Sequence, residues 1–175
     1  MLPRPENLVL KTDKKIKTVE QLKSEINIVR KTSNLKIVLV TGVFDLVHPG
    51  HADYFEKAKN HGDILIVSIV DDRYVEKGPG RPIFSHELRL SWLAALEAVD
   101  YVVLNGDYGP WKVMKAIKPD VYVKGYNLTR GLMKDIALMR DLGGQTILIP
   151  EIMHSTEIFE KIAGLQIIEN KNKPH

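Results

Sequence analysis

Runs of apolar residues divide this chain into short strand-like segments and longer helix-like segments. Val- and Ile-rich runs predict buried β-strands over residues 36–41, 64–70, 101–104, 121–124 and 146–149. Between these runs, apolar positions recur at helical spacing near residues 50–60, 86–98, 110–117, 130–142 and 156–163. Strands that alternate with helices in this way predict an α/β fold, namely a Rossmann-like, doubly wound parallel sheet in a single domain.

One more helix is predicted before the first strand. Thr18 and Gln21 have the spacing of a capping box, and the apolar positions that follow predict a helix to about Lys31. Residues 1–17 are polar and rich in lysine, so we expect an extended N-terminal extension. The domain is then expected over residues 18–165, followed by a C-terminal tail over residues 166–175.

Three polar loops follow predicted strands, at residues 42–51, 71–81 and 124–127. In an open parallel sheet the carboxyl ends of the strands meet at one edge, and ligands bind there, at the point where the strand order reverses. The sequence therefore predicts that these loops share one binding edge.

The first of these loops contains the most informative motif of the chain. His48 and His51 flank Pro49 and Gly50, and a helical pattern begins near His51. The free N–H groups and the positive end of the dipole at a helix start favour an anionic phosphate, so we interpret the motif as a nucleotide-phosphate site. Two alternatives are a structural role and metal ligation, although zinc needs a third protein ligand, and Asp45 better suits stabilisation of the turn.

Two further segments carry candidate phosphate contacts. Lys77 and Arg81 lie in a stiff glycine- and proline-containing loop. This loop is either a solvated turn or a cationic clamp on phosphate. Arg89, in the helix that follows, would join that clamp or form a structural salt bridge. Ser155 and Thr156 stand at the beginning of the last predicted helix. They form an ordinary N-cap, donate hydrogen bonds to the distal phosphates of a triphosphate, or do both.

Composition and charge exclude several classes of protein. The chain has no cysteine, which excludes disulfides and thiolate catalysis, and its formal net charge of +3 is too small to indicate nucleic-acid binding. No apolar run approaches the roughly 18 residues that span a bilayer, and residues 1–17 do not form a secretory signal, so we expect a cytoplasmic protein with no membrane partner. The P-loop and G-x-G-x-x-G motifs are absent.

Together these motifs resemble the cytidylyltransferase-like nucleotidyltransferases, which share the H-x-G-H motif, a Rossmann-like sheet and a Ser-Thr helix start near the end of the domain. Within that family the chain is most similar to the adenylyltransferase domain of the bifunctional heptose-phosphate kinase/adenylyltransferases. The resemblance is carried by residues 42–51, 77–82, 96–100, 119–120, 123–125 and 155–156. The chain departs from the heptose pattern after Gly125, where Tyr126 and Asn127 replace Gly-Asp-Tyr, and at Glu157.

The resemblance implies transfer of AMP from ATP to a phosphorylated sugar such as D-glycero-D-manno-heptose 1-phosphate, with release of pyrophosphate. It implies catalytic roles for His48, His51 and Lys77. The implied nucleotide-binding residues are Gly42, Val43, Phe44, Gly50, Arg81, Lys124, Gly125, Ser155 and Thr156. Mg²⁺ would bridge the distal phosphates with no protein residue assigned as its ligand, and the protein would be a homodimer.

The resemblance leaves both the base and the acceptor open. A CTP-dependent glycerol-3-phosphate-type cytidylyltransferase and an FMN adenylyltransferase are alternatives within the same family. A catalytically silent nucleotide-binding domain is an alternative of another class. It would retain the fold and lose the cations, and the presence of His48, His51 and Lys77 argues against it.

Overall fold

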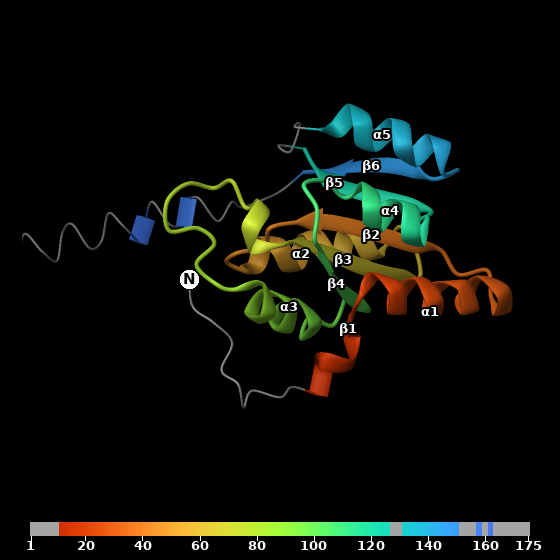
Figure 1. Cartoon of the computed structure of the whole chain (residues 1–175), viewed down its shortest axis with the longest axis horizontal. Coiled ribbons are helices and arrows are strands. Elements are labelled where there is room, and N and C mark those ends of the chain that lie inside the picture. The colour runs from red at the N-terminus through yellow and green to blue at the C-terminus, as the bar shows by residue number, and fades with distance from the viewer. Residues whose placement is uncertain (1–10, 127–130, 151–156, 159–160, 163–175) are drawn as a thin grey trace, which may run out of the picture.

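The computed structural model describes residues 11–126, 131–150, 157–158 and 161–162 (Figure 1). Their helices and strands, in chain order, are η1 (Lys11–Lys15), β1 (Ile16–Lys17), α1 (Val19–Thr32), β2 (Ile37–Gly42), α2 (Pro49–Lys59), β3 (Ile64–Val70), η2 (Asp72–Tyr74), α3 (His86–Ala94), β4 (Tyr101–Asn105), α4 (Trp111–Ile117), β5 (Val121–Gly125), α5 (Leu132–Asp141) and β6 (Gln145–Ile149). The predicted α/β fold is confirmed.

All pairings in the sheet are parallel, and the strand order is β1-β4-β3-β2-β5-β6. From β2 the chain crosses over to β3 on one side, whereas from β5 it crosses over to β6 on the other side. The connections after these two adjacent strands therefore leave in opposite directions. This is the switch point of the sheet, and the loops after β2 and β5 border it.

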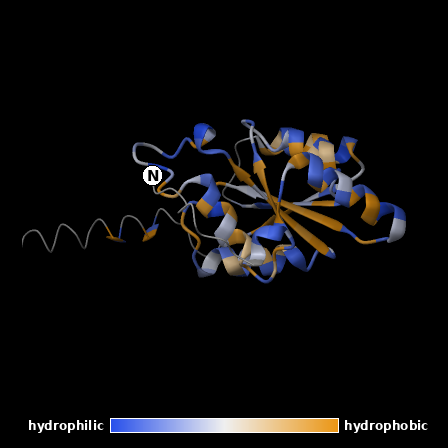
Figure 2. Ribbon diagram, turned by 60° about the horizontal axis from the view of Figure 1, so that its bottom comes forward, coloured by the Kyte–Doolittle hydropathy of each residue, from blue (hydrophilic) through white to orange (hydrophobic). Residues whose placement is uncertain are grey.

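Helices cover both faces of the sheet, and each face has its own apolar core. Helices α2 and α3 pack on one face, with Phe55 and Leu93 fully buried. Helices α1, α4 and α5 pack on the other, with Leu22, Met114 and Met139 fully buried. Figure 2 shows the result, an apolar sheet flanked by helices that carry both hydrophobic and hydrophilic residues. Strands buried on both faces explain the nearly continuous apolar runs in the sequence.

The capping box predicted at the start of α1 is present. The Gln21 backbone N–H donates to Thr18 Oγ1 at 3.2 Å, and the Thr18 N–H donates to Gln21 Oε1 at 2.9 Å. Just before it the structure differs from the sequence prediction of an extended extension. Lys11–Lys15 forms a 3₁₀ helix, and Ile16–Lys17 pairs with β4 as an edge strand. A strand of two residues is too short to leave a hydrophobic pattern in the sequence.

The predicted helix over residues 86–98 ends early, at Ala94. The chain turns there because Val99 packs in the core and the Asp100 side chain accepts a hydrogen bond at the beginning of β3. The Leu65 backbone N–H donates to Asp100 Oδ2 at 2.7 Å, and Lys59 forms an ion pair with the same carboxylate.

Within the described part of the chain, no helix has the length and apolar character that crossing a bilayer requires.

Helix α1 offers a matched test of this packing. Ile26 is 1% exposed and Ile28 is 62% exposed on the same helix. Ile26→Ala should lower the free energy of unfolding by about 2–5 kcal/mol through lost burial and the cavity left behind. Ile28→Ala makes the same Ile-to-Ala change in helix propensity and should change the free energy of unfolding by less than about 0.5 kcal/mol. Urea denaturation of both variants measures the difference, and equal losses would contradict the packing described for α1.

Candidate active site

The loop after β2 begins with an unusual backbone conformation. Phe44 has φ of +48°, a left-handed conformation that is rare for residues other than glycine, and its ring is buried in the α2–α3 core. The ring lies directly over Gly42, where an added Cβ would approach it to 2.7 Å. The glycine and the strained phenylalanine are therefore one structural unit. The Phe44 side chain packs inside, and the nucleotide contact predicted for the backbone of this stretch stays a prediction.

His48 and His51 lie together at the beginning of α2. Their ring centroids are 3.9 Å apart with the planes tilted by 34°. His51 also contacts the edge of the Phe44 ring, with the centroids 5.3 Å apart. His48 occupies the N-cap position, but its side chain makes no capping hydrogen bond. Its carbonyl accepts the His51 N–H at 2.8 Å. The first turn of α2 is thus left without a side-chain cap, with two imidazoles beside it, as an anion site requires.

Asp45 connects the loop of residues 75–85 to the loop that carries the histidine pair. Its buried carboxylate accepts hydrogen bonds from the backbone N–H groups of Ile83, at 2.8 Å, and Phe84, at 3.2 Å, and from the Arg81 guanidinium. The predicted role of Asp45 was to stabilise its own turn, but it instead holds a second loop. Arg81 is therefore engaged with a buried carboxylate, and its contact to a nucleotide stays a prediction.

Arg89 has a structural role that the sequence pattern left undecided. Its side chain is 0% exposed, and it donates to the carbonyls of Val43, Val70 and Phe84 and to Asp72. These acceptors lie in the loop after β2, at the end of β3 and just before α3. One guanidinium therefore fixes the relative positions of the segments that surround the histidine pair.

The carboxylate that pairs with Arg89 has a shifted pKa. Burial of Asp72 favours its neutral form, but hydrogen bonds from Arg89 and from the backbone and ring of His86 outweigh that penalty and lower its pKa below the ordinary 3.8. Asp72, His86 and Glu87 also lie close enough to share a metal ion. Because Asp72 already binds the fixed charge of Arg89, the arrangement functions as an ion-pair network.

Lys124, predicted to lie near the base or ribose, belongs to a second buried network beneath the end of β5. Its ammonium donates to Asp135 at 2.7 Å, and Trp111 Nε1 donates to the same carboxylate at 3.0 Å. The Tyr122 hydroxyl also donates to Asp135 and lies 2.8 Å from Thr41 Oγ1. Burial, followed by the charge of Asp135, raises the pKa of Tyr122 well above 10. The network links the ends of β2 and β5 across the switch point.

The remaining predicted residues divide between two groups. Val43, Gly50, Lys77 and Gly125 lie in or next to the loops at the carboxyl edge of the sheet. Ser155, Thr156 and most of the predicted helix over residues 156–163 lie outside the described residues. The salt bridge of Arg89 is one of the two roles that the sequence left open. The contribution of Asp135 was missed because a single Asp in a helical pattern carries no local sign of its long-range partners.

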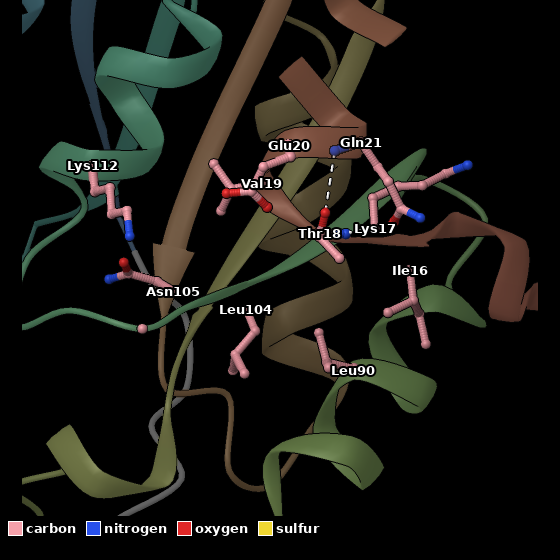
Figure 3. A pocket seen from close by; sticks show the side chains of 11 residues that line it. Ile16, Lys17, Thr18, Val19, Glu20, Gln21, Leu90, Leu104, Asn105 and Lys112 are labelled. Atoms are coloured by element: carbon pink, nitrogen blue, oxygen red, sulfur yellow. Dashed lines mark hydrogen bonds between the residues drawn. The ribbon is translucent and has the colours of Figure 1, made fainter. Parts of the chain in front are cut away.

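A hollow of about 460 Å³ lies farther along the same edge, where β1 and β4 end (Figure 3). Ile16, Leu90 and Leu104 supply apolar walls, and Thr18, Asn105 and Lys112 supply polar groups. None of the predicted site residues that the structure describes is among its lining side chains. The nearby beginning of α1 already has its capping box, so this hollow lacks the uncapped helix start present at α2.

The sequence also matches a known protein family. The family model described as cytidylyltransferase-like matches residues 39–170. The chain belongs to the cytidylyltransferase-like nucleotidyltransferases. The predicted membership is confirmed.

Relatives within the family are considerably longer proteins. The chain is 40% identical over 136 residues to the bifunctional protein HldE of Pseudomonas fluorescens, which covers 75% of this chain and 29% of that protein. It is 34% identical over 152 residues to the HldE protein of Desulfatibacillum aliphaticivorans, covering 85% of this chain and 31% of that protein. The chain therefore spans less than a third of the length of these relatives.

Solved structures share the fold of this chain. A lipopolysaccharide core biosynthesis protein from Thermoplasma volcanium superposes with a TM-score of 0.60 and 27% identity, covering 70% of this chain and all of that one. A pantoate–β-alanine ligase from Francisella tularensis, crystallised with an ATP analogue and β-alanine, has the same TM-score at 19% identity, covering 80% of this chain and 68% of that one. The second similarity concerns the fold alone.

Removing the buried guanidinium should destabilise the protein. Arg89→Met leaves several carbonyls without their donor and Asp72 without its guanidinium partner, so we expect the free energy of unfolding to fall by about 3–5 kcal/mol. Arg140→Met on the exposed side of α5 is the control and should cost less than about 0.5 kcal/mol. Urea denaturation compares them, and a small loss for Arg89→Met would contradict its bridging role.

The lowered pKa of Asp72 predicts a pH dependence. Because the folded pKa lies below 3.8, ionised Asp72 contributes its full stabilisation above pH 3.8 and loses it as the pH falls through the folded value. The stability difference between the wild type and Asp72→Asn should therefore be constant near neutral pH and shrink in acid. Denaturant titrations over a pH series measure it, and a difference that widens in acid would contradict the ion pair.

Proposed function

We propose that the chain transfers a nucleotidyl group, AMP from ATP, to a phosphorylated sugar such as D-glycero-D-manno-heptose 1-phosphate, with release of pyrophosphate. The observation that carries the proposal is the pair of adjacent imidazoles, His48 and His51, at an uncapped helix start beside the switch point of the sheet. Family membership supports a nucleoside triphosphate as the donor. The HldE relatives support ATP and a sugar phosphate, and CTP is the alternative donor.

The proposed reaction is a single displacement at phosphorus. An oxygen of the acceptor phosphate attacks the α-phosphorus of the triphosphate, so one P–O bond forms as the bond to the bridging α–β oxygen breaks. Pyrophosphate leaves with that electron pair. The attacking phosphate is already ionised at neutral pH and needs no general base, so catalysis consists of positioning and charge stabilisation.

Several of the predicted residues have a role in this scheme. His48 and His51 donate hydrogen bonds to the triphosphate and bind most tightly when negative charge builds up at the α-phosphoryl group. Lys77 balances that charge from the neighbouring loop. Ser155 and Thr156 bind the distal phosphates. The backbone at Gly42, Val43 and Gly125 contacts the nucleotide.

Mg²⁺ enters this proposal as a companion of the triphosphate. Asp45, in the loop that leads to the histidines, already accepts from Arg81, Ile83 and Phe84. Asp53, on α2 just after His51, pairs with Lys57. Both carboxylates are therefore poorly suited to ligate a metal. Mg²⁺ commonly binds through substrate phosphates and water with few protein ligands, and when bound here it would neutralise charge on the distal phosphates. We further propose a homodimeric, cytoplasmic protein, by analogy with the family.

The proposal is tested by measuring pyrophosphate release with ATP, CTP and GTP, each combined with heptose 1-phosphate, mannose 1-phosphate, sn-glycerol 3-phosphate, FMN and phosphoethanolamine. We expect release with ATP and a sugar 1-phosphate. Turnover restricted to CTP and glycerol phosphate, or to ATP and FMN, would replace the proposed substrates by those alternatives. Raised thermal stability with a nucleotide but no turnover with any acceptor would favour a silent binding domain.

The histidine pair gives a matched prediction within the same assay. His51→Ala removes a donor to the reacting phosphates and should lower turnover by about 10²–10³-fold. His61→Ala changes an exposed histidine just after α2, at the opposite edge of the sheet, and should leave turnover unchanged. Both variants should unfold at similar urea concentrations. Near-normal turnover of a folded His51→Ala protein would refute the catalytic role.

A further inference from the structure

The loop that carries Lys77 contacts the loop after β4 through three residues with no role in the scheme above. Tyr108 donates its hydroxyl to Glu76 Oε1 at 3.1 Å, and the rings of Tyr74 and Tyr108 lie with their centroids 5.1 Å apart. We call Tyr74, Glu76 and Tyr108 the tyrosine–glutamate cluster. Tyr108 is 64% exposed, and the cluster belongs to neither apolar core.

The topology places this cluster beside the histidine pair. Tyr74 ends η2, directly after β3, and Tyr108 lies three residues beyond β4. Strands β3 and β4 are parallel neighbours, so both loops emerge at the carboxyl edge of the sheet, as does the loop after β2. Glu76 immediately precedes Lys77, and the same loop returns to the histidine loop through the pairing of Arg81 with Asp45. The cluster therefore flanks the phosphate site on the side away from β5.

The chemistry of the cluster suits a hydroxyl-rich molecule. A carboxylate accepts hydrogen bonds from several hydroxyl groups, and a tyrosine hydroxyl both donates and accepts. An exposed tyrosine ring also offers a flat apolar surface to the C–H face of a sugar or polyol. Lys77, next in the chain, adds a positive charge to the same loop.

We propose that the tyrosine–glutamate cluster is the acceptor subsite of the transferase and selects the carbon skeleton of a phosphorylated sugar or polyol. This proposal rests on the proposed function and extends it to the acceptor. Glu76 accepts hydrogen bonds from the acceptor hydroxyls, and the Tyr108 ring packs against its C–H face. The Tyr108 hydroxyl is a positioning group, because it orients the Glu76 carboxylate.

An ammonium-bearing acceptor such as phosphoethanolamine is less compatible with the same residues. Aromatic rings beside a carboxylate can bind an ammonium group through cation–π contacts. Here, however, the guanidinium of Arg73 already lies over the Tyr74 ring, 5.6 Å from its centroid. Lys77 adds a second positive charge to the same loop. The arrangement therefore favours an acceptor whose recognition depends on neutral hydroxyl groups.

The test separates acceptor recognition from nucleotide binding. Glu76→Ala should raise the KM for mannose 1-phosphate by about 10–100-fold, the typical effect of losing hydrogen bonds to a charged group. The KM for ATP should stay within about twofold of the wild-type value, since only the acceptor contact changes. Glu76→Gln retains a hydrogen-bond acceptor and should restore part of the loss. Tyr108→Phe, which retains the ring, should raise the same KM by less than Glu76→Ala.

The chain offers a matched control for the tyrosine. Tyr101, at the opposite end of β4, also makes a hydrogen bond to a glutamate, Glu25. Tyr101→Phe removes the same type of contact far from the loops and should leave both KM values unchanged. Glu97→Ala, in the exposed turn before β4, is the corresponding control for Glu76.

Equilibrium binding of mannose 1-phosphate, measured by calorimetry in the presence of a non-hydrolysable ATP analogue, distinguishes the possible failures. Binding that weakens in Glu76→Ala but not in Tyr101→Phe supports the subsite, whether or not pyrophosphate is released. Absence of pyrophosphate release would refute the proposed reaction alone. Turnover or binding that is the same in Glu76→Ala and the wild type refutes the subsite alone. Wild-type protein that binds phosphoethanolamine more tightly than any sugar or polyol phosphate also refutes it.

Discussion

A fully buried guanidinium holds together the loops at the carboxyl edge of the sheet. Arg89 reaches from α3 to carbonyl groups at the end of β3, in the loop after β2 and just before its own helix, and it pairs with Asp72. Burying a charge is costly unless it is paired and hydrogen-bonded, and these acceptors fulfil that condition. The loops that carry the proposed chemistry follow different strands, and this fixed contact defines their relative positions.

Two further buried carboxylates extend the same arrangement. Asp45 binds the returning end of the Lys77 loop, and Asp135 collects donors from Lys124, Trp111 and Tyr122 beneath the end of β5. Each carboxylate receives at least three donors, which offsets the cost of its desolvation. A triphosphate bound at the start of α2 would therefore meet a preorganised surface, the condition under which fixed dipoles and cations lower a barrier effectively.

Much of this organisation was predictable from the sequence. The Val- and Ile-rich runs indicate strands buried on both faces, and their alternation with helices restricts the topology to a parallel sheet with right-handed crossovers. The H-x-G-H motif indicates a phosphate site, and the structure brings His48 and His51 into contact at the predicted helix start. The strand β1 was missed because two residues carry no periodic pattern. The end of α3 was predicted too late because a long-range contact requires the chain to turn after Ala94.

Local pattern thus determined the fold class, the family and the position of the histidine pair, because each depends on residues close together in the chain. The assignment of partners to Arg81, Arg89 and Lys124 was decided by tertiary structure alone. Each of these side chains pairs with a carboxylate elsewhere in the chain, and only the packed sheet brings the partners together. A cation in a loop or at a strand end has the same local sequence whether it binds a ligand or a buried aspartate.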